Sequence, residues 1–224
     1  MNLNQLDPEQ RPRERLLRDG AAVLSDPELL AIFLGTGIKG RDALALAGDL
    51  LRDNGGFRGL LGSDRKKLSS LRGLGPGKTA LLLASIELVR RSYAQAWRHQ
   101  THLESPDRAA EYFRCLLAHR DREVFACAFL DTRLRLIEVE ELFTGTLSQT
   151  EVHPREIVKR VLSHNAHAVI LAHNHPSGSQ EPSRADLLLT EKIVEALRLI
   201  DVRVLDHLIV AGDHTCSLAA KGMM

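Results

Sequence analysis

Apolar residues between positions 11 and 97 recur every three or four residues, which is the spacing of amphipathic helices. The segment SDPELLAIFLG carries helix signals at both ends, with Ser25 as an N-cap, a proline in the first turn and a stop at Gly35. Residues 41–56 repeat the pattern and end at two glycines, and residues 68–97 contain two helical runs around a turn. We therefore predict an all-helical domain over residues 1–100.

The pattern changes after the polar stretch RHQTHLESPDR, which predicts a linker. Beyond it, short apolar runs typical of strands alternate with amphipathic helical stretches. The predicted order is helix 105–120, strand 124–131, strand 133–143, helix 153–166, strand 167–175, helix 182–200 and strands 201–212 and 214–219. This α/β order predicts a second domain over residues 105–224, in which helices flank one mixed sheet.

Composition limits the classes of protein that the chain can belong to. Apolar residues make up 44% of the 224 positions, enough for a sizeable core. No apolar run reaches the roughly 18–20 residues that a membrane helix needs, and MNLNQLDPEQRPRERLL has no apolar signal-peptide core. Three cysteines without a CxxC pair predict no disulfide framework. We expect a cytoplasmic protein with no membrane partner.

The two parts of the chain differ in charge although the whole carries only +1. Residues 1–100 hold 16 Lys and Arg against 11 Asp and Glu, whereas residues 101–224 hold 14 against 18. A basic first part and an acidic second part indicate either different partners or an ordinary solvated surface, and the charge alone leaves both open.

The stretch LAHNHPSGSQEPSRAD contains the most informative chemistry in the chain. His173 and His175 are two residues apart at the end of a predicted buried strand, so both side chains should leave it on the same side. Asp186 falls in the first turn of the helix that follows the loop. Two imidazole nitrogens, one carboxylate oxygen and an open fourth position form the usual ligand set of a catalytic zinc ion. An alternative is that Ser183 and Asp186 form only a helix capping box.

His173-x-His175-Pro176, followed after six residues by Ser183 and after two more by Asp186, resembles the JAMM motif of JAB1/MPN metalloproteases. The strings FTGTLSQTEVHPREIVKRVL, AHNHPSGSQEPSRAD and DHLIVAG are similar to those of the bacterial RadC family, over nearly the whole chain. Asn174 departs from the wider motif, which usually has Ser or Thr between the histidines.

The resemblance implies a zinc-dependent hydrolase of amide or isopeptide bonds. It implies a general base upstream of the first strand, where Glu123 stands, with Glu140 and Glu141 as rival candidates. It also implies that Ser183 donates a hydrogen bond to the developing oxyanion. The substrate would be a protein or peptide that the sequence does not name.

GLGPGKT at positions 73–79 is not a P-loop, because the glycine required five residues before Gly77 is replaced by Arg72. The stretch instead fits a helix-hairpin-helix, whose exposed amides suit a phosphate. The residues expected to contact DNA are Arg65, Lys66, Lys67, Arg72, Gly73, Gly75 and Lys78. The alternative is a hairpin used only for packing or dimer contacts.

Two other histidine positions leave alternatives open. His153 is expected to start a helix rather than to touch the metal site. Asp206-His207 is either a pair that supports a metal ligand from behind or a pair at a strand edge.

Two functions therefore follow from the sequence. The first is a zinc hydrolase in the second domain. The second is a DNA-binding protein linked to repair or recombination, in which the metal domain is structural, regulatory or itself active on DNA or DNA-bound proteins.

Overall fold

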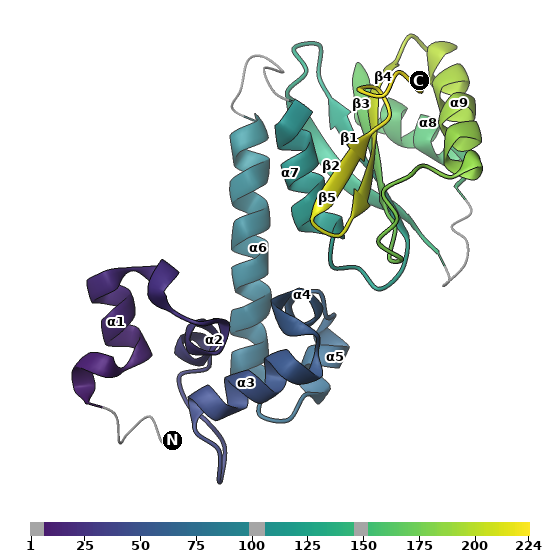
Figure 1. Cartoon of the computed structure of the whole chain (residues 1–224). Coiled ribbons are helices and arrows are strands. Elements are labelled where there is room, and N and C mark those ends of the chain that lie inside the picture. The colour runs from purple at the N-terminus through teal and green to yellow at the C-terminus, as the bar shows by residue number, and fades with distance from the viewer. Residues whose placement is uncertain (1–6, 99–105, 146–151) are drawn as a thin grey trace. The chain divides into compact units, whose positions relative to one another are not determined.

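The computed structural model describes residues 7–98, 106–145 and 152–224. Its internal contacts divide the chain into two compact units, Met1–Leu88 and Val89–Met224. Figure 1 shows helices throughout the first unit and a sheet with helices in the second. The division falls within one long helix. Of the predicted linker, residues 98–108, positions 99–105 lie outside the described residues, whereas Arg98 ends α6 and residues 106–108 begin α7.

The first unit is helical, as predicted. Its elements are η2 (Pro8–Gln10), α1 (Pro12–Asp19), η3 (Ala21–Val23), α2 (Asp26–Leu34), α3 (Ala43–Asp53), α4 (Gly56–Leu61), α5 (Arg65–Ser70) and the first part of α6 (Pro76–Arg98). The short helix α4 is one that the sequence pattern does not separate from its neighbours. In the described part of the chain no helix is both long and apolar enough to cross a membrane.

Local signals in the sequence explain where these helices begin. The predicted cap at Ser25 starts α2, and the Ser25 backbone N–H donates to Glu28 Oε2 at 2.8 Å. Asp42 and Asp64 cap α3 and α5 by accepting from backbone N–H groups three residues on, at 2.8 and 2.7 Å. Helices α2 to α6 share one core of leucine and alanine that includes the fully buried Leu60 and Leu68.

The second unit is built on a five-stranded mixed sheet, in the order β2-β1-β3-β4-β5. Its elements are the end of α6, α7 (Pro106–Leu117), β1 (Val124–Leu130), β2 (Leu136–Thr144), α8 (Pro154–Ser163), β3 (Ala168–Asn174), α9 (Arg184–Arg198), β4 (Arg203–Ala211) and β5 (His214–Ser217). The pair β3–β4 is parallel, and the other three pairs are antiparallel. The predicted α/β class and mixed sheet are confirmed.

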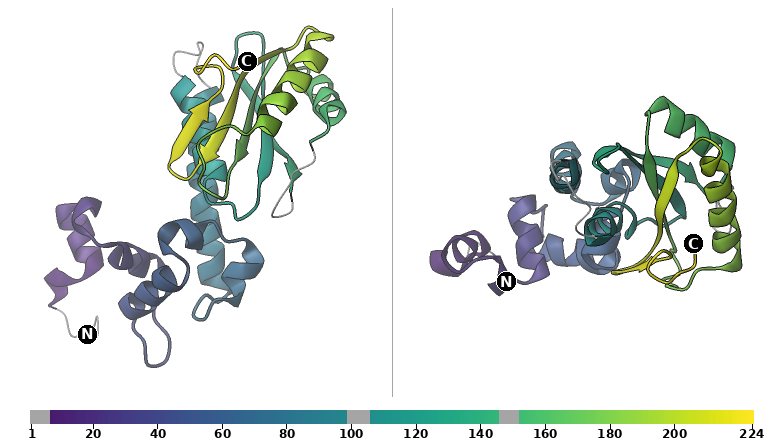
Figure 2. Two further views of the ribbon diagram at one scale, coloured as in Figure 1. Left: turned by 45° about the vertical axis from the view of Figure 1, so that its right-hand side comes forward. Right: turned by 90° about the horizontal axis from the view of Figure 1, so that it is seen from above.

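Helices cover both faces of this sheet (Figure 2). Even-numbered residues of β1 and β3, such as Ala126 and Ala172, pack with α7 and the end of α6, where Trp97 lies. Odd-numbered residues, such as Cys127 and Leu171, pack with α8 and α9. Side chains alternate between the two faces along a strand, so odd-numbered and even-numbered residues of β3 pack against different helices. Both faces are covered, and the strand is therefore apolar on both.

Candidate metal centre

His173 and His175 lie where β3 ends. His173 continues the odd-numbered side chains that face α9, and it is 2% exposed. His175 follows directly after the strand, and its backbone N–H still donates to the Val210 carbonyl of β4 at 2.9 Å. This pairing keeps the chain extended past the strand end, so both imidazoles point to the same side, as their spacing predicts.

Asp186 approaches these imidazoles from the first turn of α9. The carboxylate oxygen Oδ2 accepts from the backbone N–H and the hydroxyl of Ser183, both at 2.7 Å. The Asp186 backbone N–H donates to Ser183 Oγ at 3.1 Å, which completes a capping box. The capping box and the convergence on the histidines therefore occur together, and the two interpretations of Ser183 and Asp186 are not exclusive.

The potential ligand atoms of three side chains converge. His173 Nε2 and His175 Nε2 are 3.0 Å apart. Asp186 Oδ1 lies 3.3 Å from His173 Nε2, and Asp186 Oδ2 lies 3.4 Å from His175 Nε2. This group of three side chains could hold a metal ion. The structure thus brings together His173, His175 and Asp186, the three ligands proposed from the sequence.

The other ring nitrogen of His175 shows which of its nitrogens is available to a metal. His175 Nδ1 lies 2.8 Å from the backbone carbonyl of Ser179. A carbonyl only accepts hydrogen bonds, so Nδ1 carries the proton, and Nε2 of the neutral ring presents its lone pair to the cluster. This arrangement is common among histidines that bind metals.

The charges of the cluster stabilise one another when no metal is bound. The hydrogen bond with Asp186 raises the pKa of His175, and the charge of Glu123 adds to this rise. Burial alone would raise the pKa of Asp186, but His173 and His175, which donate to this carboxylate when their rings are protonated, and the hydrogen bond from Ser183 outweigh burial and hold that pKa far below its ordinary value. Asp186 is therefore ionised at neutral pH, as a metal ligand must be.

The ring nitrogen of His173 that faces away from the ligand cluster begins a chain of hydrogen bonds through β4 and α9. This atom, Nδ1, lies 2.8 Å from Nε2 of the fully buried His207, whose Nδ1 lies 2.6 Å from Thr190 Oγ1. Burial holds the pKa of His207 well below its ordinary value, so the ring is uncharged. Of the two interpretations of Asp206-His207, the structure supports a contact behind the ligand for His207. The Asp206 carboxylate instead accepts from Ser217 Oγ at 2.6 Å.

Asn174, between the two candidate histidine ligands, is hydrogen-bonded to the segment that leads into β1. Its Oδ1 accepts from the backbone N–H of Val124 at 2.8 Å, and its Nδ2 donates to the carbonyls of Arg120 and Arg122 at 3.3 and 3.0 Å. Glu123 lies between these anchored positions and is partly buried. The β1–β3 register pairs Phe125 with His173 and, continued by two residues, sets Glu123 opposite His175.

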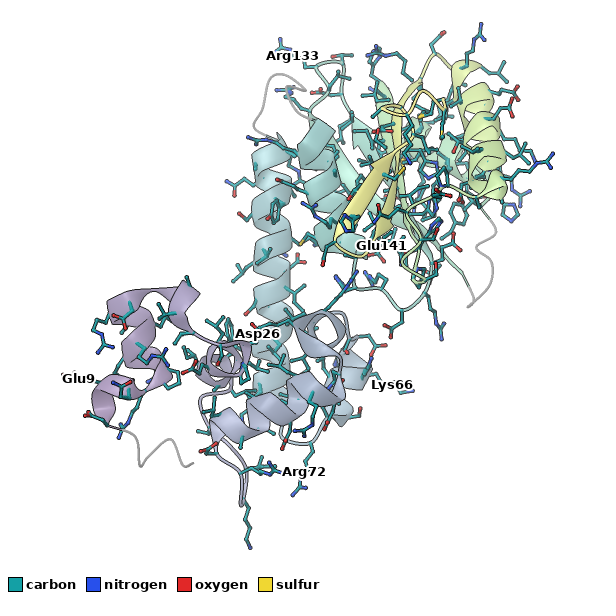
Figure 3. The ribbon with its side chains drawn as sticks, viewed as in Figure 1. Glu9, Asp26, Lys66, Arg72, Arg133 and Glu141 are labelled. Carbon is teal, nitrogen blue, oxygen red and sulfur yellow. The ribbon has the colours of Figure 1, made fainter. Side chains whose placement is uncertain are left out.

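The rival glutamates have other partners. Glu140 lies 2.8 Å from His164 Nε2 and 3.0 Å from Arg160 Nε. Glu141, labelled in Figure 3, forms an ion pair with Arg120. His153 occupies the N-cap position of α8, as expected. The charge of Glu123 contributes to the raised pKa of His175.

The basic candidates for DNA contact lie in the first unit. Arg65, Lys66, Lys67 and Arg72 are exposed, and Figure 3 shows Lys66 and Arg72 projecting outward. A shallow pocket of about 680 Å³ is lined by Asp64, Arg65, Lys66, Ser69 and Ser70. Gly73 and Gly75 lie in the turn between α5 and α6, and the Lys78 ammonium donates to the Thr36 carbonyl.

Comparison with known proteins agrees with this fold. Residues 103–223 match the RadC-like JAB domain, and residues 3–80 match the UPF0758 N-terminal domain. The second unit therefore contains a JAB domain, which follows a helical N-terminal region in the sequence. The chain is 51% identical to UPF0758 proteins of Azotobacter vinelandii and Thiobacillus denitrificans, over 96% and 95% of both chains. It is 48% identical to one of Xanthomonas campestris, over 99% of both chains. The chain belongs to the RadC family, and the relatives named here are UPF0758 proteins.

Proposed function

We propose that this chain is a zinc-dependent hydrolase that cleaves an amide or isopeptide bond in a protein or peptide. The observation that carries the proposal is the convergence of His173 Nε2, His175 Nε2 and one carboxylate of Asp186 within 3.0–3.4 Å of one another.

The donor set fits zinc better than a hard cation. Imidazole nitrogen with a single carboxylate suits zinc, whereas calcium and magnesium prefer sites made of oxygen ligands. Ligand atoms that lie 2.0–2.1 Å from a tetrahedral zinc ion are about 3.3 Å from one another. His173 Nε2 and His175 Nε2 are 3.0 Å apart, and each lies 3.3–3.4 Å from one of the two Asp186 carboxylate oxygens, distances close to that value.

Glu123 is the residue that we assign to proton transfer. Zinc, when bound, lowers the pKa of a coordinated water to about 7 and polarises the carbonyl of the substrate. Glu123 then takes the proton from the attacking water and delivers it to the departing amine. Two observations support this role. Asn174 holds the neighbouring residues Arg122 and Val124 by hydrogen bonds, and the charge of Glu123 raises the pKa of His175.

We assign Ser183 to stabilisation of the developing oxyanion, which requires a change in its hydrogen bonding. Its hydroxyl has a single hydrogen, which in this structure is donated to Asp186 Oδ2. To stabilise a developing oxyanion, Ser183 must redirect that hydrogen toward the substrate. The Ser183 backbone N–H also donates to Asp186 Oδ2, and it would continue to hold the carboxylate.

Zinc content measured by elemental mass spectrometry tests the site directly. We expect about one zinc per chain in the wild type and in Glu123→Gln, and a loss of zinc in Asp186→Asn. Asp213→Asn, which neutralises an exposed carboxylate outside the cluster, is the matched control and should retain zinc. Wild-type protein that lacks zinc after expression in zinc-supplemented medium would refute the proposal.

Activity is tested separately on peptides that contain a lysine isopeptide bond, with cleavage followed by mass spectrometry. Wild type should cleave at least one member of the pool, and Glu123→Gln should not, although it binds zinc. Equal cleavage by both proteins would remove Glu123 from the mechanism.

A second function, contact with DNA by the first unit, is supported by the exposed cations of α5 and the following turn. Such binding should weaken with salt, because phosphate contacts release counterions. The double variant Lys66→Gln/Lys67→Gln should reduce both the affinity for duplex DNA and its salt dependence, whereas Lys39→Gln, an exposed lysine outside α5 and that turn, should not. Salt-independent binding, or none, would contradict this second function.

A further inference from the structure

The partner of His173 Nδ1 is unusual in that it does not by itself determine which atom carries the proton. The carbonyl next to His175 can only accept a hydrogen bond. His207, in contrast, can accept or donate at Nε2, depending on its tautomer. If His207 donated, the proton of the neutral His173 ring would lie on Nε2, and that atom would have no lone pair for a metal.

Thr190 resolves this choice. Its hydroxyl lies 2.6 Å from the backbone carbonyl of Asp186, four residues earlier in α9, and must donate its only hydrogen there. The same oxygen lies 2.6 Å from His207 Nδ1, so in that contact it can only accept. The proton of His207 is therefore on Nδ1.

The remaining contact follows from the first. A neutral His207 with its proton on Nδ1 has a lone pair on Nε2, and it accepts from His173 Nδ1 at 2.8 Å. A charged imidazole is disfavoured at this position, because His207 is 0% exposed and its two ring nitrogens contact Thr190 and His173, neither of which is an acidic side chain. His173 thus presents the lone pair of Nε2 to the cluster.

The backbone around His207 prevents the ring from leaving this chain of hydrogen bonds. The His207 N–H donates to Asp206 Oδ1 at 2.7 Å, and the His207 carbonyl accepts from Leu218 N–H at 3.1 Å. Phe125 packs edge-on against the ring, with centroids 5.5 Å apart. Thr190 is 1% exposed, so water does not compete for its hydroxyl.

We propose that His207, oriented by Thr190, is a positioning residue that sets the tautomer of His173 and so makes its Nε2 a metal ligand. The hydrogen bonds run from the side chain of one ligand, His173, to the backbone of another, Asp186, through two residues that do not touch the metal. This inference rests on the proposed metal site, but its first consequence, the tautomer of His207, can be observed without metal.

The test compares two substitutions of one residue. Thr190→Val keeps the shape and removes the acceptor, whereas Thr190→Ser keeps the hydroxyl. We expect the zinc affinity of Thr190→Val, measured by competition with a chelator, to fall about 10- to 100-fold. Thr190→Ser should remain close to wild type. A purely structural role of Thr190 in packing would instead make the smaller serine the more harmful change.

Long-range proton–nitrogen NMR spectra of the histidine rings provide the second measurement, on metal-free wild type at pH 8. We expect His207 with its proton on Nδ1, and a change of this signature in Thr190→Val. A proton on Nε2 of His207 in the wild type would overturn the inference without any variant having to fold.

The two proposals fail in different ways. Wild type that binds no zinc refutes the metal site, whatever the tautomer of His207. Wild type that binds zinc, together with a Thr190→Val protein of unchanged affinity, refutes only the role given to His207 and Thr190.

Discussion

The Asn174 side chain accepts a hydrogen bond from the backbone N–H of Val124 at 2.8 Å. This bond joins the residue between His173 and His175 to the first residue of β1. The histidines on either side of Asn174 face the metal cluster, while Asn174 points to the opposite layer and holds the segment that carries Glu123. A serine or threonine hydroxyl has one hydrogen and a shorter reach, and it could not make these three contacts together.

Asn174→Ala should therefore separate metal binding from catalysis. It leaves the buried Val124 N–H without its acceptor, which costs about 1–3 kcal/mol of stability. We expect chemical denaturation to show that loss, zinc content to stay near wild type, and cleavage to fall because Glu123 is no longer held. Loss of zinc in this variant would contradict the separation.

Removal of zinc should destabilise the second unit, because an ion that binds only the folded state stabilises it by mass action. At a free concentration of 1,000 times Kd the gain is about 4 kcal/mol. We expect a chelator to lower the Tm of wild type and to have no effect on Asp186→Asn. A wild-type Tm that does not respond to chelator and zinc would argue against a resident ion.

Two matching capping boxes allow the cap and the metal functions of Ser183 to be distinguished. Ser25 with Glu28 in α2 and Ser183 with Asp186 in α9 have the same backbone geometry. Each serine-to-alanine change should cost about 1 kcal/mol of stability. Only Ser183→Ala should also weaken zinc binding, since Asp186 loses a hydrogen bond that orients it. Equal zinc affinity in both variants would leave Ser183 with the cap alone.

The turn between α5 and α6 offers a paired test of backbone strain. Gly73 has φ +90°, and a Cβ there would lie 2.8 Å from the Leu46 side chain. Gly75 has no positive φ, and its Cβ would meet nothing within 4 Å. Gly73→Ala should lower stability by about 1 kcal/mol or more, whereas Gly75→Ala should be neutral or slightly stabilising. Similar losses at both glycines would contradict this account of the turn.

Acid should weaken the first unit through Glu28. Burial alone would raise the pKa of this carboxyl, but hydrogen bonds from Ser25 and the charge of Arg15 lower it below its ordinary value of 4.5. A group whose pKa is lower in the folded state contributes stability above its unfolded pKa, and that contribution is lost as pH falls through the folded pKa. The stability difference between wild type and Glu28→Gln should therefore shrink from pH 6 to pH 3. Hydrogen exchange in α2 measures it, and a constant difference would contradict the assignment.

Much of the candidate site could be predicted because its spacing is local. Two residues along a strand return to the same face, and three residues after an N-cap lie in the first turn of a helix, so His173, His175 and Asp186 required only these backbone periods. The α/β order of elements was readable for the same reason. The division by internal contacts falls inside α6, a continuous helix whose residues after Leu88 belong to the second unit.

The sequence by itself determined the three candidate ligands and the alternation of helices and strands. Only the tertiary structure decided which residues form hydrogen bonds with the ligands and with Asn174 between them. His207 lies 34 positions beyond His173 and Val124 lies 50 before Asn174, and no local period relates such residues. Their contacts depend on the register of β1 and β4 against β3, which is set by packing of the whole sheet between its helical layers. The direction of the hydrogen bonds from His173 to Thr190 follows from that packing, because each buried donor in the chain must find an acceptor.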